Sequence, residues 1–129
     1  MRTEALNAMT DEELEQYART LGFTTKAAKS HDAKVRLIAK RRERGVDVSV
    51  LGVDLRVPVR AAHDLRFTQL VSKPDRTDDD IETAMTMLLG DEQMGALREA
   101  ATEDDGTVDQ DALAFAYARV LSSDELKNF

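Results

Sequence analysis

The sequence predicts a mainly helical α+β protein with one small β-hairpin. An N-terminal helix-extended-helix piece is followed by the hairpin and by a bundle of about four helices. Apolar residues recur at helical spacing in most segments. They alternate with polar residues from Val46 to Val59, which is the pattern of strands. Glycines and prolines, among them Gly22, Gly45, Gly52, Pro74 and Gly90, mark expected ends and turns of these segments.

The length and composition restrict the class of protein. A chain of 129 residues can bury roughly two thirds of its unfolded surface and fold as one domain, or as one small domain with an appendage. It contains no cysteine, which excludes disulfides and thiolate chemistry and agrees with a cytoplasmic protein. No apolar run approaches the roughly 20 residues of a membrane span, and the N-terminal segment lacks the apolar stretch of a signal peptide. We expect a soluble, cytoplasmic protein that does not contact a membrane.

Charge divides the chain into two parts. Residues 1–45 carry ten Lys or Arg and seven Asp or Glu, whereas residues 46–129 carry eight and eighteen. We therefore expect a basic N-terminal segment, 1–45, and an acidic domain, 46–129. The acidic domain would repel phosphates, so nucleic-acid binding is expected only through residues 31–44, if at all.

The basic segment contains two predicted helices. Residues 1–9 carry little signal, and we expect them to be poorly ordered. A capping box of Thr10 and Glu13 begins the first helix, and Gly22 ends it. The second helix is expected from His31 or Asp32 to Arg44, after an irregular link. The apolar faces of the two helices comprise Leu14, Tyr17, Ala18, Leu21, Val35, Ile38 and Ala39.

This segment resembles the helix-extended-helix motif of SAP-like and LEM-like modules, through its Leu-Gly-Phe corner and its basic second helix. Some of these modules bind DNA. Arg36, Lys40 and Arg44 are spaced four apart, as expected for a helical side that follows phosphates. The alternative is that they are solvated surface residues, which the absence of interleaved aromatic residues favours.

The alternating stretch predicts a hairpin whose two strands meet at a Leu51-Gly52 turn. Because a lone hairpin is marginal in water, its valine face is expected to pack on helices, or its edge to pair with another chain. Pro58 is expected to close the second strand or to mark it as an edge.

Helices follow the hairpin. The first is expected from Arg60 or Ala61 to Val71, burying Leu65, Phe67, Leu70 and Val71. Thr77 should cap the next helix, with three aspartates in the first turn. Gly90 should end that helix, and Asp91 should cap the one after it. The apolar face of this helical corner comprises Ile81, Ala84, Met85, Leu88, Leu89, Met94, Leu97 and Ala101.

The polar loop 102–108 resembles a calcium loop only in part. With Gly106 at the invariant glycine position, alanines occupy the first and last ligand positions, so we expect a solvated loop.

The last long helix is expected from Asp109 to Leu121, and Ser122-Ser123 should cap a short final turn. It is apolar nearly all round, since Phe115 and Leu121 project away from its main apolar face, which comprises Leu113, Ala116, Tyr117 and Val120.

No enzymatic site is predicted. His31 and His63 lack metal-ligand spacing and have polar neighbours, and the chain has no phosphate-binding glycine loop and no nucleophile elbow. Neither a cofactor nor a metal is expected.

The order of elements in residues 48–129 resembles the tail assembly chaperones of long-tailed bacteriophages. Two motifs carry the resemblance, V-x-V-L-G-V-x-L-x-V-P from Val48 to Pro58 and D-x-x-x-A-M-x-M-L-L-G-D-E-Q from Asp80 to Gln93. The basic segment departs from the matched part.

The resemblance implies a non-enzymatic protein of the bacterial host cytoplasm, absent from the mature virion. Such a protein binds the tape measure protein, keeps it soluble and helps to recruit tail tube subunits. Self-association is left open, and the gene of such a protein often continues into a second reading frame by ribosomal frameshifting near Lys127.

We expect the partner-binding surface to include Phe67, Met87, Phe115 and Leu121, since flexible or aromatic apolar side chains suit such contacts. The alternative is a DNA-associated module with an acidic partner-binding or dimerisation domain.

Overall fold

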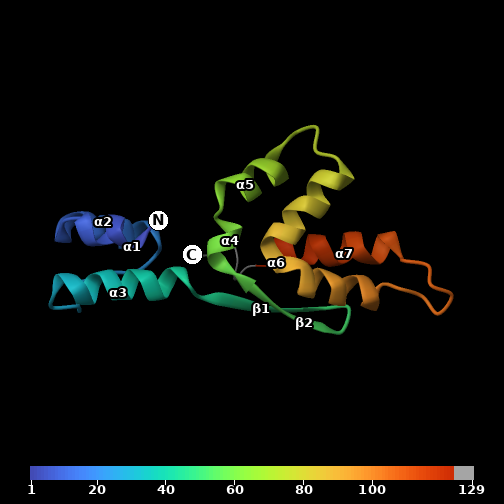
Figure 1. Cartoon of the computed structure of the whole chain (residues 1–129), viewed down its shortest axis with the longest axis horizontal. Helices are drawn as coiled ribbons and strands as arrows, with labels where there is room; N and C mark the ends of the chain where they lie inside the picture. The colour runs from blue at the N-terminus through green and yellow to red at the C-terminus, as the bar shows by residue number, and fades with distance from the viewer. Residues whose placement is uncertain (124–129) are drawn as a thin grey trace. The chain divides into compact units, whose positions relative to one another are not determined.

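The computed structural model describes residues 1–123, which form seven helices and one two-stranded antiparallel sheet. The predicted mainly helical α+β class with one hairpin is confirmed (Figure 1). The chain divides into two compact units, which we call unit 1, Met1–Arg44, and unit 2, from Gly45 onward.

Unit 1 contains α1 (Thr3–Ala8), α2 (Asp11–Thr20) and α3 (His31–Arg42). The expectation that residues 1–9 are poorly ordered is wrong. They form α1, because Leu6 is only 1% exposed and packs into the core of this unit. That core comprises Leu6, Leu14, Ala18, Val35 and Ile38, with Met9, Tyr17, Leu21 and Phe23 at its margin.

The signals at both ends of α2 are confirmed. The Thr10 side chain accepts a hydrogen bond from the Glu13 N–H, and the Glu13 carboxylate accepts from the Thr10 N–H. Gly22, at φ 86°, reverses the chain, so that the Phe23 N–H donates to the Ala18 carbonyl. This is the Schellman arrangement that glycine favours at the end of a helix.

A buried polar contact fixes the link after α2. Thr25 is fully buried, and both its N–H and its hydroxyl donate to the Glu15 carboxylate, which also accepts from the Thr24 hydroxyl. These hydrogen bonds, that of the Thr25 hydroxyl first, lower the pKa of Glu15 to about 2. The link is irregular, as predicted, but a helix side chain holds it in place.

The second predicted helix is two residues shorter than expected. Ser30 caps α3 by accepting from the Ala33 N–H, and the helix ends at Arg42. The last N–H groups, of Glu43 and Arg44, donate to carbonyls three residues back, so the helix tightens and stops before the first strand.

Unit 2 begins with the hairpin of β1 (Gly45–Val50) and β2 (Val53–Pro58), paired from Gly45 opposite Pro58 to Val50 opposite Val53. Leu51 and Gly52 have φ of 54° and 74°, the left-handed conformation that two-residue hairpin turns require. Val50, Leu55 and Val57 are buried on one face of the hairpin. The other face is polar and carries an ion pair of 3.1 Å between Asp47 and Arg56.

The single helix expected after the hairpin is instead two, α4 (Val59–Ala62) and α5 (Leu65–Ser72). The chain breaks at His63 because the Asp64 side chain accepts from the Arg66 N–H and starts a new helix. The prediction that Leu65 is buried is therefore wrong. Leu65 lies in the first turn of α5 and is 68% exposed, whereas Phe67 is buried.

Helix α6 (Asp78–Ala100) contains both predicted helices of the corner, with a kink at Gly90 (Figure 1). Thr77 and Asp80 form a capping box at its start. Gly90 has φ 80° and ψ 164°, a backbone region that is essentially restricted to glycine. The sequence predicted that Asp91 would cap the second helix of the corner. The residue with non-helical backbone angles is instead Gly90, which directly precedes the second half of α6. The buried residues of α6 are Ala84, Met85, Leu88, Leu89, Met94 and Leu97.

A closed loop joins α6 to α7 (Gln110–Leu121). The Glu103 N–H donates to the Thr107 carbonyl and the Gly106 N–H donates to the Glu103 carbonyl, so backbone bonds close the loop. Asp109 caps α7, which buries Ala116, Tyr117 and Val120 as predicted. The predicted turn that ends at residues 126–129 lies outside the described residues.

Candidate functional site

The kink in α6 places one side chain against the outer edge of β2. The Gln93 Oε1 accepts from the Arg56 N–H at 2.6 Å, and the Gln93 Nε2 donates to the Arg56 carbonyl at 2.9 Å. The same Nε2 donates to the Leu89 carbonyl at 2.7 Å. The Gln93 amide thus pairs with Arg56 as the peptide group of a third strand would. The corner from Leu88 to Gln93 is accordingly a structural device that joins helix and hairpin.

A second polar cluster joins α7 to the first half of α6 and joins the two halves of α6 to each other. Tyr117 is 8% exposed, and its hydroxyl donates to Glu82 Oε2 at 2.8 Å. Arg98 Nη2 donates to Glu82 Oε1 at 2.6 Å. Burial, followed by the contact with Glu82, raises the pKa of Tyr117 above its ordinary value. The phenol therefore stays protonated and acts as a fixed hydrogen-bond donor.

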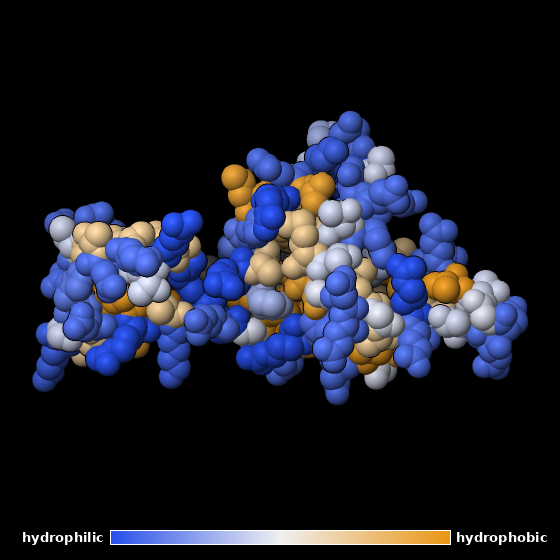
Figure 2. All heavy atoms as spheres, in the orientation of Figure 1, coloured by the Kyte–Doolittle hydropathy of each residue, from blue (hydrophilic) through white to orange (hydrophobic). Residues whose placement is uncertain are grey.

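The outward side of α7 carries the most prominent aromatic surface of unit 2. Phe115 is 58% exposed, whereas Ala116, Tyr117 and Val120 face the core. Its neighbours on the exposed side are Asp111, Ala114, Ala118, Arg119 and Ser122. In Figure 2, hydrophobic atoms reach the surface of unit 2 at several separate places among hydrophilic ones.

The structure does not gather the four predicted partner-binding residues into one patch. Phe67 is only 5% exposed and belongs to the core, so its assignment to a binding surface is wrong. Met87 and Leu121 are half-buried. Leu121 is six positions from Phe115 on the same helix and hence about 120° around it. Only Phe115 is broadly available, and the exposed Leu65 is an apolar surface residue that the sequence pattern placed inside.

The predicted phosphate-contacting residues also separate. Arg36 and Lys40 are exposed on α3, but Arg44 lies beyond the helix end and is half-buried. The line of three cations on one helical side is therefore incomplete. Of the other basic side chains, Lys34 lies 3.4 Å from Asp11, and Arg41 stacks over the Phe23 ring at 5.4 Å. Both contribute to the packing of unit 1.

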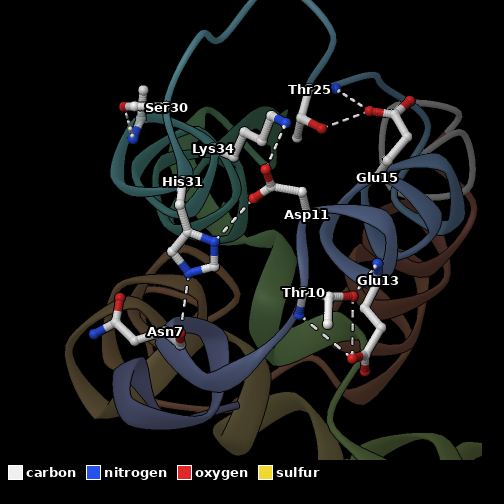
Figure 3. Close-up of polar contacts among 10 residues, drawn as sticks. Asn7, Thr10, Asp11, Glu13, Glu15, Thr25, Ser30, His31 and Lys34 are labelled. Carbon is white, nitrogen blue, oxygen red and sulfur yellow. Dashed lines mark hydrogen bonds and ion pairs between the residues drawn. The ribbon is translucent and has the colours of Figure 1, made fainter.

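His31 joins all three helices of unit 1 (Figure 3). Its Nδ1 lies 2.9 Å from Asp11 Oδ1 and its Nε2 lies 3.0 Å from the Asn7 carbonyl oxygen. Because both partners are acceptors, both ring nitrogens must carry protons for the two hydrogen bonds to form together. The contact with Asp11, and then that with Asn7, raises the pKa of His31, and the pKa of Asp11 is lowered in return. The sequence pattern gave His31 no role, because its partners are 20 and 24 residues away.

Within residues 1–123, no group of three or more His, Asp or Glu side chains is arranged to hold a metal ion. No helix in that range is long and apolar enough to cross a membrane. Fold and surface thus define a small α+β protein whose most distinctive surface feature is an exposed aromatic side chain on a helix. No known protein family, curated protein or solved structure matches the chain.

Proposed function

We propose that this protein is a non-enzymatic chaperone for a long helical partner, and specifically a tail assembly chaperone of a long-tailed bacteriophage or prophage. In this role it binds the tape measure protein in the bacterial cytoplasm, keeps it soluble and assists assembly of the tail tube. It is absent from the mature virion. The observation that carries the proposal is the exposure of Phe115 on α7, within the segment that resembles this class of chaperone.

The chemistry of the surface supports the proposal. A long helical chain with apolar stripes needs a partner that covers those stripes without forming a large aggregate. A single exposed aromatic residue beside alanines allows a partner helix to approach closely, and such helix-on-helix contacts are a recurring mode of recognition. The acidic sequence from Val46 onward keeps a complex soluble through its net negative charge.

The Leu88–Gln93 corner has a structural role, so the partner-binding surface is sought elsewhere in unit 2. Gly90 supplies the kink and Gln93 supplies the link to β2. In this chain, the Leu88–Gln93 part of the second motif thus has a structural role. Partner binding is assigned instead to α7, and to the half-buried Met87 of α6 as a lesser contributor.

Co-expression tests the proposal. Under the proposal, we expect a neighbouring open reading frame that encodes a long helical protein, and that protein is to be expressed with and without this chain. We expect the long protein to be insoluble alone, and soluble and co-purified with this chain. If the long protein is equally soluble without this chain, or if the pair never co-purifies, the chaperone function is refuted.

The gene adds a second test. For this class of protein we expect the codons for Leu126-Lys127-Asn128 to form an adenine-rich slippery heptamer, and we expect an overlapping reading frame to follow it.

A DNA-associated role for α3 is the alternative proposal. It is favoured by Arg36 and Lys40, which are exposed and have no charged partner among the described residues. It predicts salt-dependent retention on DNA that is lost when both are replaced by alanine. Absence of retention at low salt rejects this role.

A further inference from the structure

The exposed side of α7 has a symmetric arrangement of charge around its aromatic residue. Asp111, Phe115 and Arg119 are spaced four apart, so they form one ridge along the helix. All three are exposed, with Phe115 at 58%. Asp111 and Arg119 lie at equal distances on either side of Phe115, about 6 Å along the axis in each direction.

The two charged side chains are available for a partner. Among residues 1–123, neither the Asp111 carboxylate nor the Arg119 guanidinium forms an ion pair. The contacts of Asp111 and Arg119 that are seen involve only their backbone groups, since the Asp111 N–H donates to Asp109 and the Arg119 carbonyl accepts from Ser122. The charges are thus exposed at both ends of an apolar contact point.

An antiparallel second copy of α7 complements this ridge. A two-fold axis that passes beside Phe115, perpendicular to the helix, would place Asp111 of one copy opposite Arg119 of the other, and the reverse. The two Phe115 rings would meet at the axis, and the exposed Ala114 and Ala118 would let the helices approach closely. Such a self-complementary surface is what a two-fold dimer requires. A parallel copy would instead place like charges together.

We propose that the α7 ridge of Asp111, Phe115 and Arg119 is a homodimer interface, in which two copies pack antiparallel with reciprocal Asp111–Arg119 ion pairs around stacked Phe115 rings. The inference concerns the chain alone and does not depend on the chaperone function. A single helix pair is a smaller contact than the roughly 1,200 Å² of a standard stable interface, so we expect a weak dimer. If the chaperone function also holds, a helical partner competes with the second copy for Phe115.

Reciprocal charge reversal tests the proposal by analytical ultracentrifugation of the full chain from about 1 μM to 1 mM. The variants are Asp111→Lys, Arg119→Glu and the double variant. Each single reversal should raise the Kd about tenfold, because symmetry turns two attractive pairs into two repulsive ones. The double variant restores opposite charges and should return the Kd to within about threefold of the original value. Phe115→Ser should abolish the dimer.

Two control variants separate this interface from general stickiness. Leu65→Ser removes the exposed apolar residue of α5, and Glu99→Lys reverses an exposed charge on α6. Neither should change the Kd. Far-UV circular dichroism and the Tm establish that each variant is folded, and Arg119→Glu serves as the single reversal if Asp111→Lys weakens the start of α7. A monomer at 1 mM, a folded single reversal that dimerises normally, or a folded double variant that does not recover would each overturn the proposal.

Discussion

At the scale of single residues, unit 1 depends on side chains that bond across elements. Glu15 holds the buried Thr25 backbone, and His31 bonds to Asp11 and to the Asn7 carbonyl. These contacts fix the two ends of the link between α2 and α3. They explain how a unit with a core of five buried apolar side chains acquires one arrangement of its helices.

The His31 contacts predict a pH dependence for unit 1. Folding raises the pKa of His31 above the value of 6.5, through Asp11 first and Asn7 second. A group whose pKa is raised in the folded state contributes stability that is complete below the unfolded pKa. That contribution is lost as pH rises through the folded pKa. Asp11, Asp32 and Lys34 are the charged groups around the ring, and the pKa of Asp11 is lowered, first of all by its contact with His31.

An NMR titration of the His31 ring checks this expectation in the full chain. We expect a midpoint above 6.5, together with lower protection of the α1 amides above that midpoint, once exchange rates are divided by the intrinsic rate at each pH. His31→Gln should remove the pH dependence, since a neutral amide cannot donate from both sides as the imidazolium does. A midpoint at or below 6.5 would show that the two hydrogen bonds do not form together.

At the scale of elements, the kink in α6 depends on Gly90. Its φ of 80° and ψ of 164° lie in a region that is strained for any residue with a side chain. Gly90→Ala should cost about 1–3 kcal/mol in the free energy of unfolding, although a Cβ there would meet no neighbouring atom within 4 Å.

Gly95 offers a matched control in the same helix. It lies in the second half of α6 without a positive φ, and a Cβ there also has open space. Gly95→Ala should therefore stabilise the protein by about 0.5–1 kcal/mol through helix propensity. Urea unfolding of both variants measures the contrast. Equal effects at the two positions would mean that Gly90 does not hold the kink.

Gln93 is the second requirement of the corner. Gln93→Ala removes three hydrogen bonds, two of them to the edge of β2, and should lower the free energy of unfolding by about 1–3 kcal/mol. Gln93→Glu retains an acceptor for the Arg56 N–H but cannot donate to the two carbonyls. Amide exchange at Arg56 reports the contact directly, and unchanged protection in Gln93→Ala would argue against it.

The helices and the hairpin were predictable where the signal is local. The capping boxes at Thr10 and Thr77, the turn at Leu51-Gly52 and the break at Gly90 each depend on a few adjacent residues. The errors arise where tertiary packing or a competing cap decides. Leu6 alone is too little apolar periodicity to predict a helix, yet its burial stabilises α1. The local pattern favoured one continuous helix through Asp64. The Asp64 side chain instead caps α5, and Leu65, in the first turn of α5, is exposed.

The candidate surface was predictable only in part. Phe115 could be found because it lies off the main apolar face of its helix. The helical pattern also placed Phe67 on a buried face, and its 5% exposure agrees with that pattern and not with the separate expectation that it contacts a partner. The role of Gln93 depends on a contact between residues 37 positions apart, which no local pattern reveals.

At the scale of the whole molecule, the two units differ in charge and in surface. Unit 1 carries the excess of basic residues, with Arg36 and Lys40 exposed on α3. Unit 2 carries the acidic excess and an exposed aromatic residue on α7. This division assigns partner binding to unit 2 in the proposed chaperone function, and it leaves the basic unit as the place for any contact with an anionic partner.

Partner binding by α7 is tested most directly by comparing Phe115→Ser with Leu65→Ser during co-expression with the long helical protein. Both changes remove an exposed apolar side chain, so general surface polarity changes equally. We expect Phe115→Ser to reduce the co-purified partner at least about fivefold, as the loss of one central aromatic contact does, and Leu65→Ser to leave it unchanged. Equal recovery of the partner with both variants and with the unaltered chain would contradict the assignment of partner binding to α7.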